Sequence, residues 1–157
     1  MTTRQRLGVG VATVVVLAIV PPQAMGQDWP QWRGPHRDGS ISVFDVPASW
    51  PAGLTEQWKV EVGFGYATPL LVGERVYMFS RQGEDEVMLA LDPGSGQTLW
   101  RTSYPAPFEM MPATRQHGPG PKSTPTYADG RLFTLGISGI VTAFDADTGR
   151  QLWQMPG

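Results

Sequence analysis

The sequence predicts an all-β fold made of repeated four-stranded units. Three observations support this prediction: an eleven-residue motif occurs twice, short apolar runs alternate with turn residues, and sustained helical spacing of apolar residues is absent after residue 26. The 157 residues include 19 glycines and 15 prolines, which is typical of a turn-rich chain. The hydrophobic fraction of 41% is too high for a disordered tail.

The repeated motif reads Ala-x-Asp-x-x-Ser/Thr-Gly-x-x-Leu-Trp and occupies residues 90–100 and 143–153. The tryptophans at positions 58, 100 and 153 are 42 and 53 residues apart. A period near 42 with four short strands is typical of a β-propeller blade. The second interval is longer because of extra residues within Tyr104–Pro121, which we expect to form a loop insertion before the second blade.

Short runs of alternating apolar residues give four expected strands in each blade. The strands expected in the first blade are Thr68–Val72, Arg75–Ser80, Glu86–Leu91 and Gln97–Thr102. Those expected in the second are Thr124–Ala128, Arg131–Gly136, Gly139–Phe144 and Arg150–Gln154. Tight hairpins are expected at Val72-Gly73-Glu74 and Asp129-Gly130, because glycine adopts the positive φ that such turns need.

The repeated motif has a structural explanation that needs no ligand. Asp92 and Asp145 each follow a strand, and their carboxylates can accept backbone N–H groups of the turn. Gly96 and Gly149 then return the chain. We expect the tryptophans at 100 and 153 to be buried between blades, with each indole N–H bound to a backbone carbonyl.

This motif at blade spacing resembles the tryptophan-docking repeat of pyrroloquinoline quinone (PQQ)-type β-propellers. Residues 28–39, Asp-Trp-Pro-Gln-Trp-Arg-Gly-Pro-His-Arg-Asp-Gly, resemble the start of exported bacterial PQQ-like repeat proteins. The resemblance covers residues 28–157 and implies a ring of six to eight blades. Its family includes quinoprotein alcohol dehydrogenases, which bind PQQ and calcium, and a non-enzymatic propeller lipoprotein of the outer-membrane β-barrel assembly machinery.

The chain departs from both kinds of relative. It has no cysteine, so neither the disulfide that quinoprotein dehydrogenases press against the quinone nor the acylated cysteine of the lipoprotein has a counterpart. No position matches the catalytic Asp or the calcium-binding Glu and Asn by motif, so catalytic residues stay unknown and no metal ligands are assigned. The absence of zinc, phosphate-loop, dinucleotide and nucleophile-elbow motifs agrees with this assignment.

The organisation expected along the chain has three parts. Residues 1–26 read as a secretory signal peptide with cleavage after Gly26, since Arg4 and Arg6 precede an apolar stretch and small residues follow it. An uncleaved anchor is the alternative. Residues 27–57 form an N-terminal segment seated on the propeller, and residues 58–157 form two blades, 58–102 and 103–157. A periplasmic or secreted location follows.

Two blades cannot close a ring, and their open edges can pair with other chains. We therefore expect these blades to be the N-terminal part of a longer propeller. The alternative is a ring assembled from several two-blade chains.

The residues proposed as a ligand site are His117 and Lys122. They lie in the insertion, in a stretch rich in glycine and proline that leads into the innermost strand of the second blade. Loops there can open on the axial funnel, where His117 can act as a base or ligand and Lys122 can hold an anion. The alternative is a rigid, solvent-exposed turn with incidental polar groups.

Two charged groups are interpreted as structural. Glu84, Asp85 and Glu86 are expected at a solvated hairpin tip, because neighbouring side chains on an extended chain point to opposite faces and converge poorly on calcium. Ion pairs among Asp28, Arg33, Arg37 and Asp38 are expected to seat the N-terminal segment, beside Trp29 and Trp32.

The function expected from the sequence is that of a non-catalytic module that binds a protein, peptide or glycan. The alternative is part of a quinoprotein alcohol or sugar dehydrogenase, with PQQ and calcium implied by resemblance alone. A formal net charge of −2 without a run of basic residues argues against nucleic acid as a partner.

Overall fold

The computed structural model describes residues 27–42, 44 and 46–157. The expected signal peptide, residues 1–26, lies outside the described residues, so its assignment stays a prediction. Within the described part of the chain, no helix is both long enough and apolar enough to cross a membrane.

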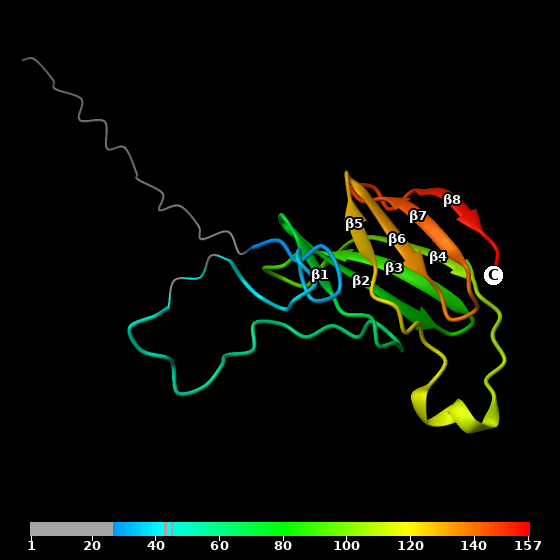
Figure 1. The fold of residues 1–157 in the computed structure, drawn as a ribbon, viewed down its shortest axis with the longest axis horizontal. Coiled ribbons are helices and arrows are strands. Elements are labelled where there is room, and N and C mark those ends of the chain that lie inside the picture. Colours follow the sequence, from blue (N-terminus) through cyan, green and yellow to red (C-terminus); the bar gives the residue numbers. More distant parts are fainter. Residues whose placement is uncertain (1–26, 43, 45) are drawn as a thin grey trace, which may run out of the picture.

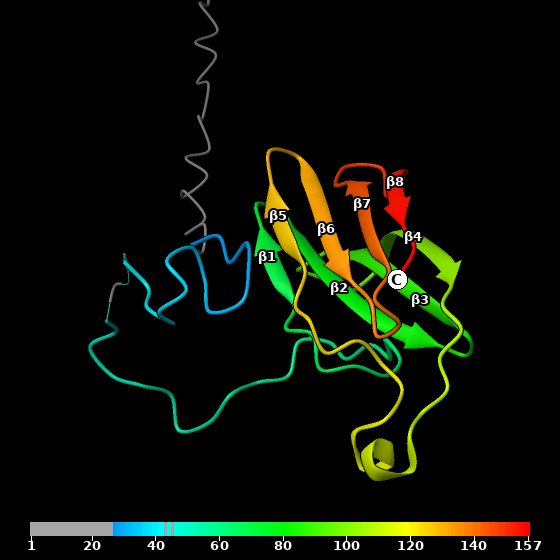
Figure 2. The same cartoon turned by 45° about the vertical axis from the view of Figure 1, so that its right-hand side comes forward.

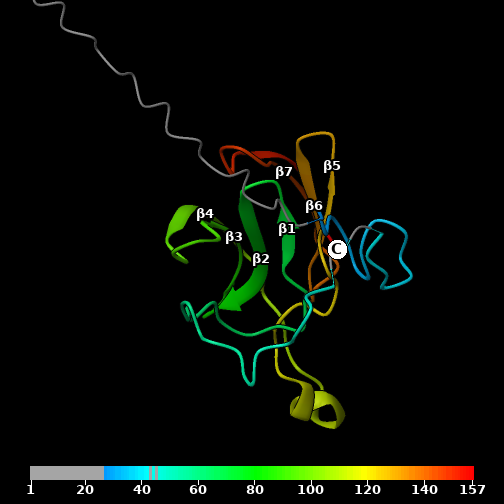
Figure 3. The ribbon, with the colours of Figure 1, turned by 90° about the vertical axis from the view of Figure 1, so that its left-hand side faces the viewer.

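The chain folds into two four-stranded antiparallel sheets, each with its strands in sequence order (Figures 1 and 3). We call the first sheet blade 1; it contains β1 (Leu70–Val72), β2 (Arg75–Gln82), β3 (Asp85–Leu91) and β4 (Thr98–Pro105). The second sheet, blade 2, contains β5 (Thr126–Ala128), β6 (Arg131–Leu135), β7 (Val141–Asp145) and β8 (Gln151–Met155). The all-β prediction and its two repeated units are confirmed, and each expected strand overlaps an observed one.

The two blades share details beyond strand order. Each has a register shift between the third and fourth strands, at Ala90/Leu91 in blade 1 and at Ala143/Phe144 in blade 2. The shift comes at the start of the fourth strand, directly after the Asp-to-Gly turn of the repeated motif. The motif therefore determines a local backbone irregularity as well as a turn.

The turns of the motif form as the sequence predicts. The carboxylate of Asp92 accepts hydrogen bonds from the backbone N–H and the hydroxyl of Ser95, both at 2.7 Å. Asp145 does the same with Thr148, at 2.9 and 2.7 Å. These hydrogen bonds stabilise the charged carboxylates and lower the pKa of both aspartates.

The main hydrophobic core lies between the two blades. Tyr77, Phe79 and Met88 of blade 1 pack in it with Leu132 and Phe144 of blade 2, and all five are at most 2% exposed. The opposite face of blade 1 has a smaller core, in which buried β3 residues pack against the partly buried Val62. Blade 1 is thus covered on both faces.

The N-terminal segment contacts the first strand of each blade. Trp29 exchanges backbone hydrogen bonds with Leu71 of β1, and the Pro30 carbonyl accepts one from Tyr127 of β5 at 2.8 Å. Figures 1 and 2 show this blue segment beside β1, while the cyan stretch that follows loops away from the sheets. Residues 28–30 are therefore bound to the blades. The domain boundary at residue 57 stays a prediction.

The expected ion pairs of this segment do not form. Arg33 donates to the backbone carbonyl of Asp38 at 3.0 Å, and Arg37 donates to the side-chain oxygen of Gln31 at 3.0 Å. Asp28 accepts the backbone N–H of Gly73 at 2.8 Å. The prediction was wrong because backbone and amide groups lie closer to these charges than opposite charges do, and the segment is held by backbone pairing instead.

The insertion contains one element that was not predicted. After β4 the chain runs out to a short 3₁₀ helix, η1 (Pro112–His117), and returns to β5. Pro112 starts this helix and Gly118, with φ of 63°, ends it. Figure 2 shows the helix, in yellow, hanging beyond one end of the two sheets.

Candidate functional site

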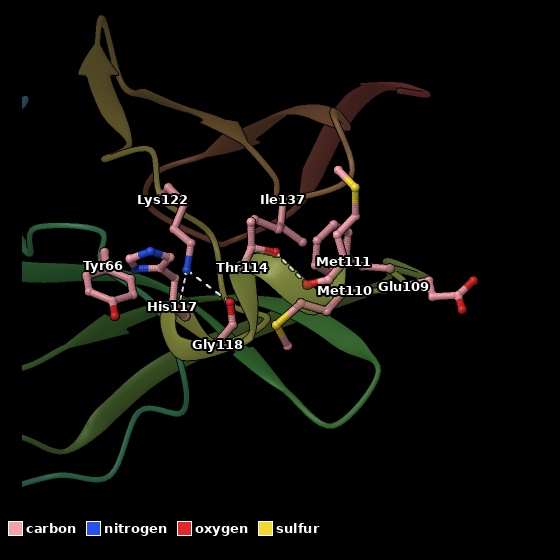
Figure 4. A pocket seen from close by; sticks show the side chains of 10 residues that line it. Tyr66, Glu109, Met110, Met111, Thr114, His117, Gly118, Lys122 and Ile137 are labelled. Atoms are coloured by element: carbon pink, nitrogen blue, oxygen red, sulfur yellow. Dashed lines mark hydrogen bonds between the residues drawn. The ribbon is translucent and has the colours of Figure 1, made fainter.

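A pocket of about 650 Å³ lies where the insertion meets the two blades. Its walls come from three parts of the chain: the segment before β1, the insertion, and the turn between β6 and β7. Both residues singled out in the sequence, His117 and Lys122, line it, together with Tyr66 and Ile137 (Figure 4). The structure therefore brings the two predicted residues into one pocket, although their role stays a prediction.

Lys122 is bound to the loop that precedes it. Its ammonium donates to the backbone carbonyls of His117 and Gly118, the latter at 3.0 Å (Figure 4), and lies 4.3 Å from the centroid of the Tyr66 ring. Desolvation of the ammonium by the neighbouring loop lowers the pKa of this otherwise exposed lysine. Two of its three N–H groups are hydrogen-bonded to carbonyls at the C-terminal end of η1. The third N–H group remains available to a ligand.

His117 stands at the rim with an exposed ring. One ring nitrogen, Nε2, lies 3.2 Å from the side-chain amide nitrogen of Gln116. Among the described residues the one ion pair joins Arg75 to Asp147, so no carboxylate orients this imidazole. Without such a partner, His117 is suited to hydrogen-bond a ligand and lacks the arrangement of a catalytic base.

The apolar lining of the pocket was missed in the sequence. It is formed by Phe108, Met110, Met111 and Ile137, and Met111 is 69% exposed. The available signal was the run Phe108-Glu109-Met110-Met111, an apolar stretch inside a segment interpreted as a plain loop. Methionine side chains are flexible and polarizable, which suits a surface that adapts to apolar groups.

One acidic residue near this region is buried, against expectation. Glu86 lies in β3 and is 0% exposed, whereas Glu84 is exposed at the hairpin tip. Its carboxylate accepts the Tyr104 hydroxyl at 2.9 Å and the backbone N–H of Ile137 at 2.6 Å. The expectation of three solvated carboxylates was wrong for Glu86, because the β6–β7 turn of blade 2 covers it and supplies a donor.

The buried Glu86 carboxylate explains why the β6–β7 turn has glycine at position 136. A β-carbon added at Gly136 would lie 1.9 Å from a Glu86 carboxylate oxygen, so only glycine fits there. Burial raises the pKa of Tyr104 to about 12, which keeps its hydroxyl protonated as a donor. Glu86 and Tyr104 therefore hold Ile137 in place on the pocket wall.

The residues present do not make a site for PQQ with calcium. Glu109 is the one carboxylate among the pocket's lining residues, whereas calcium takes six to eight oxygen ligands. Throughout the described ranges, His, Asp and Glu side chains form no group of three or more suited to a metal ion. A tricarboxylate quinone would also meet a single lysine whose ammonium is already bound to two carbonyls.

Comparison with protein families gives one match that covers most of the chain. The model described as outer membrane protein assembly factor BamB matches residues 37–156. This match spans both sheets, the insertion and most of the N-terminal segment.

Individual relatives include an enzyme and an assembly factor. A probable quinate dehydrogenase (quinone) of Xanthomonas campestris pv. juglandis is 26% identical over 92% of this chain and 25% of its own length. The crystal structure of BamB from Moraxella catarrhalis aligns with a TM-score of 0.46 at 24% identity, covering 64% of this chain and 26% of that one. A europium-containing methanol dehydrogenase aligns with a TM-score of 0.41 at 26% identity, covering 59% and 16%. The chain thus spans about a quarter or less of the length of each.

Proposed function

Because this chain belongs to the PQQ-like repeat family of the outer membrane protein assembly factor BamB, we propose that its two blades form part of a propeller that binds a protein, peptide or glycan without catalysing a reaction. Fold alone does not decide function within such a family, so the proposal rests on the pocket. The observation that carries it is an apolar pocket beside the insertion whose polar groups are few and lack a catalytic arrangement.

The lining favours a peptide with apolar side chains. Phe108, Met110, Met111 and Ile137 offer an apolar wall, while His117 and the remaining donor of Lys122 lie at one end. A leucine, methionine or phenylalanine side chain would bury apolar surface there, at about 25 cal/mol per Å². A carbonyl or carboxylate of the same peptide would then accept a hydrogen bond from the polar end.

Selection of short peptides displayed on phage tests this proposal directly. Peptides selected on the wild-type chain should carry apolar side chains, and Met111→Glu should weaken their binding at least tenfold by placing a charge in the apolar wall. Leu54→Glu is the matched control, because Leu54 is 99% exposed and lies outside the pocket. Peptides that bind the Met111→Glu variant as tightly as wild type would contradict the proposed site.

A second candidate function is part of a quinone-dependent dehydrogenase. The 26% identical quinate dehydrogenase supports it, since that alignment covers nearly all of this chain. The described residues do not supply the ligands, so any quinone site would depend on other parts of a larger protein. Incubation of the native protein, as it is recovered from cells, with PQQ and calcium, followed by gel filtration, should leave no quinone absorbance with the protein. Stoichiometric retention would favour the dehydrogenase.

Export to the periplasm or beyond is part of the proposal. It rests on the order of charged, apolar and small residues in positions 1–26. N-terminal sequencing of the protein recovered outside the cytoplasm should begin at Gln27. An N-terminus at Met1 or Thr2 would support the uncleaved anchor instead.

A further inference from the structure

The polar end of the pocket is built on a fixed stretch of backbone. The Tyr66 N–H donates to the Pro121 carbonyl at 2.9 Å, and a β-carbon added at Gly120 would lie 2.2 Å from the Phe64 carbonyl oxygen. Gly120 and Pro121 are both buried. The backbone that precedes Lys122 is therefore held against the segment before β1. Because this position is fixed before a ligand arrives, less conformational entropy is lost when the lysine binds one.

Lys122 carries a positive charge that no carboxylate among the described residues neutralises. Its ammonium binds two uncharged groups, the carbonyls of His117 and Gly118, whereas the one ion pair in this part of the chain joins Arg75 to Asp147. A hydrogen bond between an ammonium and a carboxylate is roughly twice as strong as one between neutral groups. The third N–H group of Lys122 should therefore bind a carboxylate in preference to a neutral carbonyl.

His117 supplies a second donor at the same end. The side-chain amide nitrogen of Gln116 lies 3.2 Å from Nε2 of the His117 ring. Because an amide nitrogen donates and does not accept, Nε2 is the acceptor and the ring proton is on Nδ1. Figure 4 shows the His117 ring next to the Lys122 ammonium. The two oxygens of one carboxylate can then accept from two different side chains.

The other end of the pocket carries the opposite charge. Figure 4 shows Glu109 at the far end of the lining residues from Lys122, with Met110 and Met111 between them. A ligand carboxylate beside Glu109 would meet a like charge, whereas at Lys122 it meets an opposite charge. The pocket thus has a cationic end, an apolar middle and an anionic end, and this order determines the direction in which an acidic ligand binds.

We propose that this pocket selects the C-terminal residue of a peptide. The terminal carboxylate binds Lys122 and His117, and the apolar side chain of the same residue packs against Met110 and Met111. This inference rests on the proposed function and names the class of peptide that the pocket takes. An internal peptide segment has only neutral carbonyls to offer at the cationic end. All lining residues fall within residues 66–137, so the last strand of blade 2 takes no part in the pocket.

Two acetylated pentapeptides that end in Leu-Phe test this inference, one with a free carboxylate and one with a carboxamide. Each is titrated into the native protein as it is recovered from cells. The methyl NMR signals of Met110 and Met111 report binding, and that of Met78 on β2 is the reference outside the pocket. Both peptides should shift the two pocket signals, and the acid should bind about tenfold more tightly than the amide.

Two variants separate the charge of Lys122 from its role in the loop. Lys122→Gln should bring the acid down to the affinity of the amide, while unchanged binding of the amide shows that the pocket is still formed. Arg115→Gln is the matched control, because Arg115 lies on η1 outside the pocket lining, and it should keep the preference for the acid.

The outcomes distinguish this inference from the proposed function. Equal affinities of acid and amide for the wild-type protein, or a preference for the acid that survives Lys122→Gln, would overturn the inference and leave the proposed function in place. Methionine signals that neither peptide shifts would overturn both.

Discussion

Trp100 and Trp153 are the same residue of the same motif, yet one is covered and the other is not. Their strand registers and the angles to their aromatic neighbours agree closely. Only Trp100 has a glycine turn against its ring and a carbonyl at its indole nitrogen. The motif therefore determines how the tryptophan is presented, whereas the neighbouring unit determines whether the tryptophan is buried.

The largest difference is expected from alanine substitution of the two tryptophans. Trp100→Ala should reduce the free energy of unfolding by about 3–5 kcal/mol, because it leaves a cavity between the blades and removes the hydrogen bond to Ala146. Trp153→Ala should cost about 1 kcal/mol or less in the same chain, since its ring is half exposed. Urea denaturation measures both, and equal losses would contradict the comparison.

The contact between blade 1 and blade 2 should also depend on Glu86. Glu86→Ala should cost about 3 kcal/mol, because it leaves the Tyr104 hydroxyl and the Ile137 N–H buried without an acceptor. Glu84→Ala is the control at the exposed hairpin tip and should change stability by less than about 0.5 kcal/mol. If both variants unfold at the wild-type urea concentration, Glu86 does not join the blades.

A smaller effect is expected at the turn glycines. Gly149→Ala and Gly130→Ala both place alanine at φ of 73°, but only the first puts a β-carbon against Trp100. The shared backbone strain should cost about 1 kcal/mol in each variant, and the contact should add about 2 kcal/mol in Gly149→Ala. Thermal or urea unfolding of the pair isolates the contact, and identical stabilities would show that the indole does not rest on the turn.

The smallest effect is a pH dependence of the two motif turns. Hydrogen bonds from Ser95 and Thr148 lower the pKa of Asp92 and Asp145 below the ordinary value of 3.8. Their stabilisation is present above pH 3.8 and is lost as the pH falls through the lower folded-state values. Asp92→Asn/Asp145→Asn retains the acceptor oxygens and should lose less stability than wild type over this range. Parallel curves of unfolding free energy against pH for the two proteins would show that these charges do not contribute to stability.

The sequence was sufficient for the strands and turns because their determinants are local and occur twice. The motif from Ala90 to Trp100 contains its own turn acceptor, its own glycine and its own tryptophan. The second copy of the motif is therefore expected to form the same turn and the same strands as the first. The expected strand ranges differ from the observed ones mainly at β2 and β4, which extend to Gln82 and Pro105 around the longer hairpin of blade 1.

The features that sequence reasoning missed depend on contacts between distant segments. Glu86 is buried by a turn some 51 residues away in sequence, which alternation along β3 could not reveal. The pocket joins Tyr66 to the insertion and to Ile137, so Phe108 and the two methionines have no local pattern that marks them as a wall. His117 and Lys122 were found because an unusual glycine- and proline-rich stretch surrounds them.

Hydroxyl-radical footprinting of the protein as it is recovered from cells shows whether Trp153 is covered in the native protein. Trp100 and Trp32 are internal standards for a covered and an open indole, since Trp32 is 57% exposed. We expect Trp153 to be oxidised as slowly as Trp100, because a further blade would cover it in the proposed propeller. Oxidation of Trp153 at the rate of Trp32 would contradict the proposed propeller, since Trp153 would then be open to solvent in the native protein.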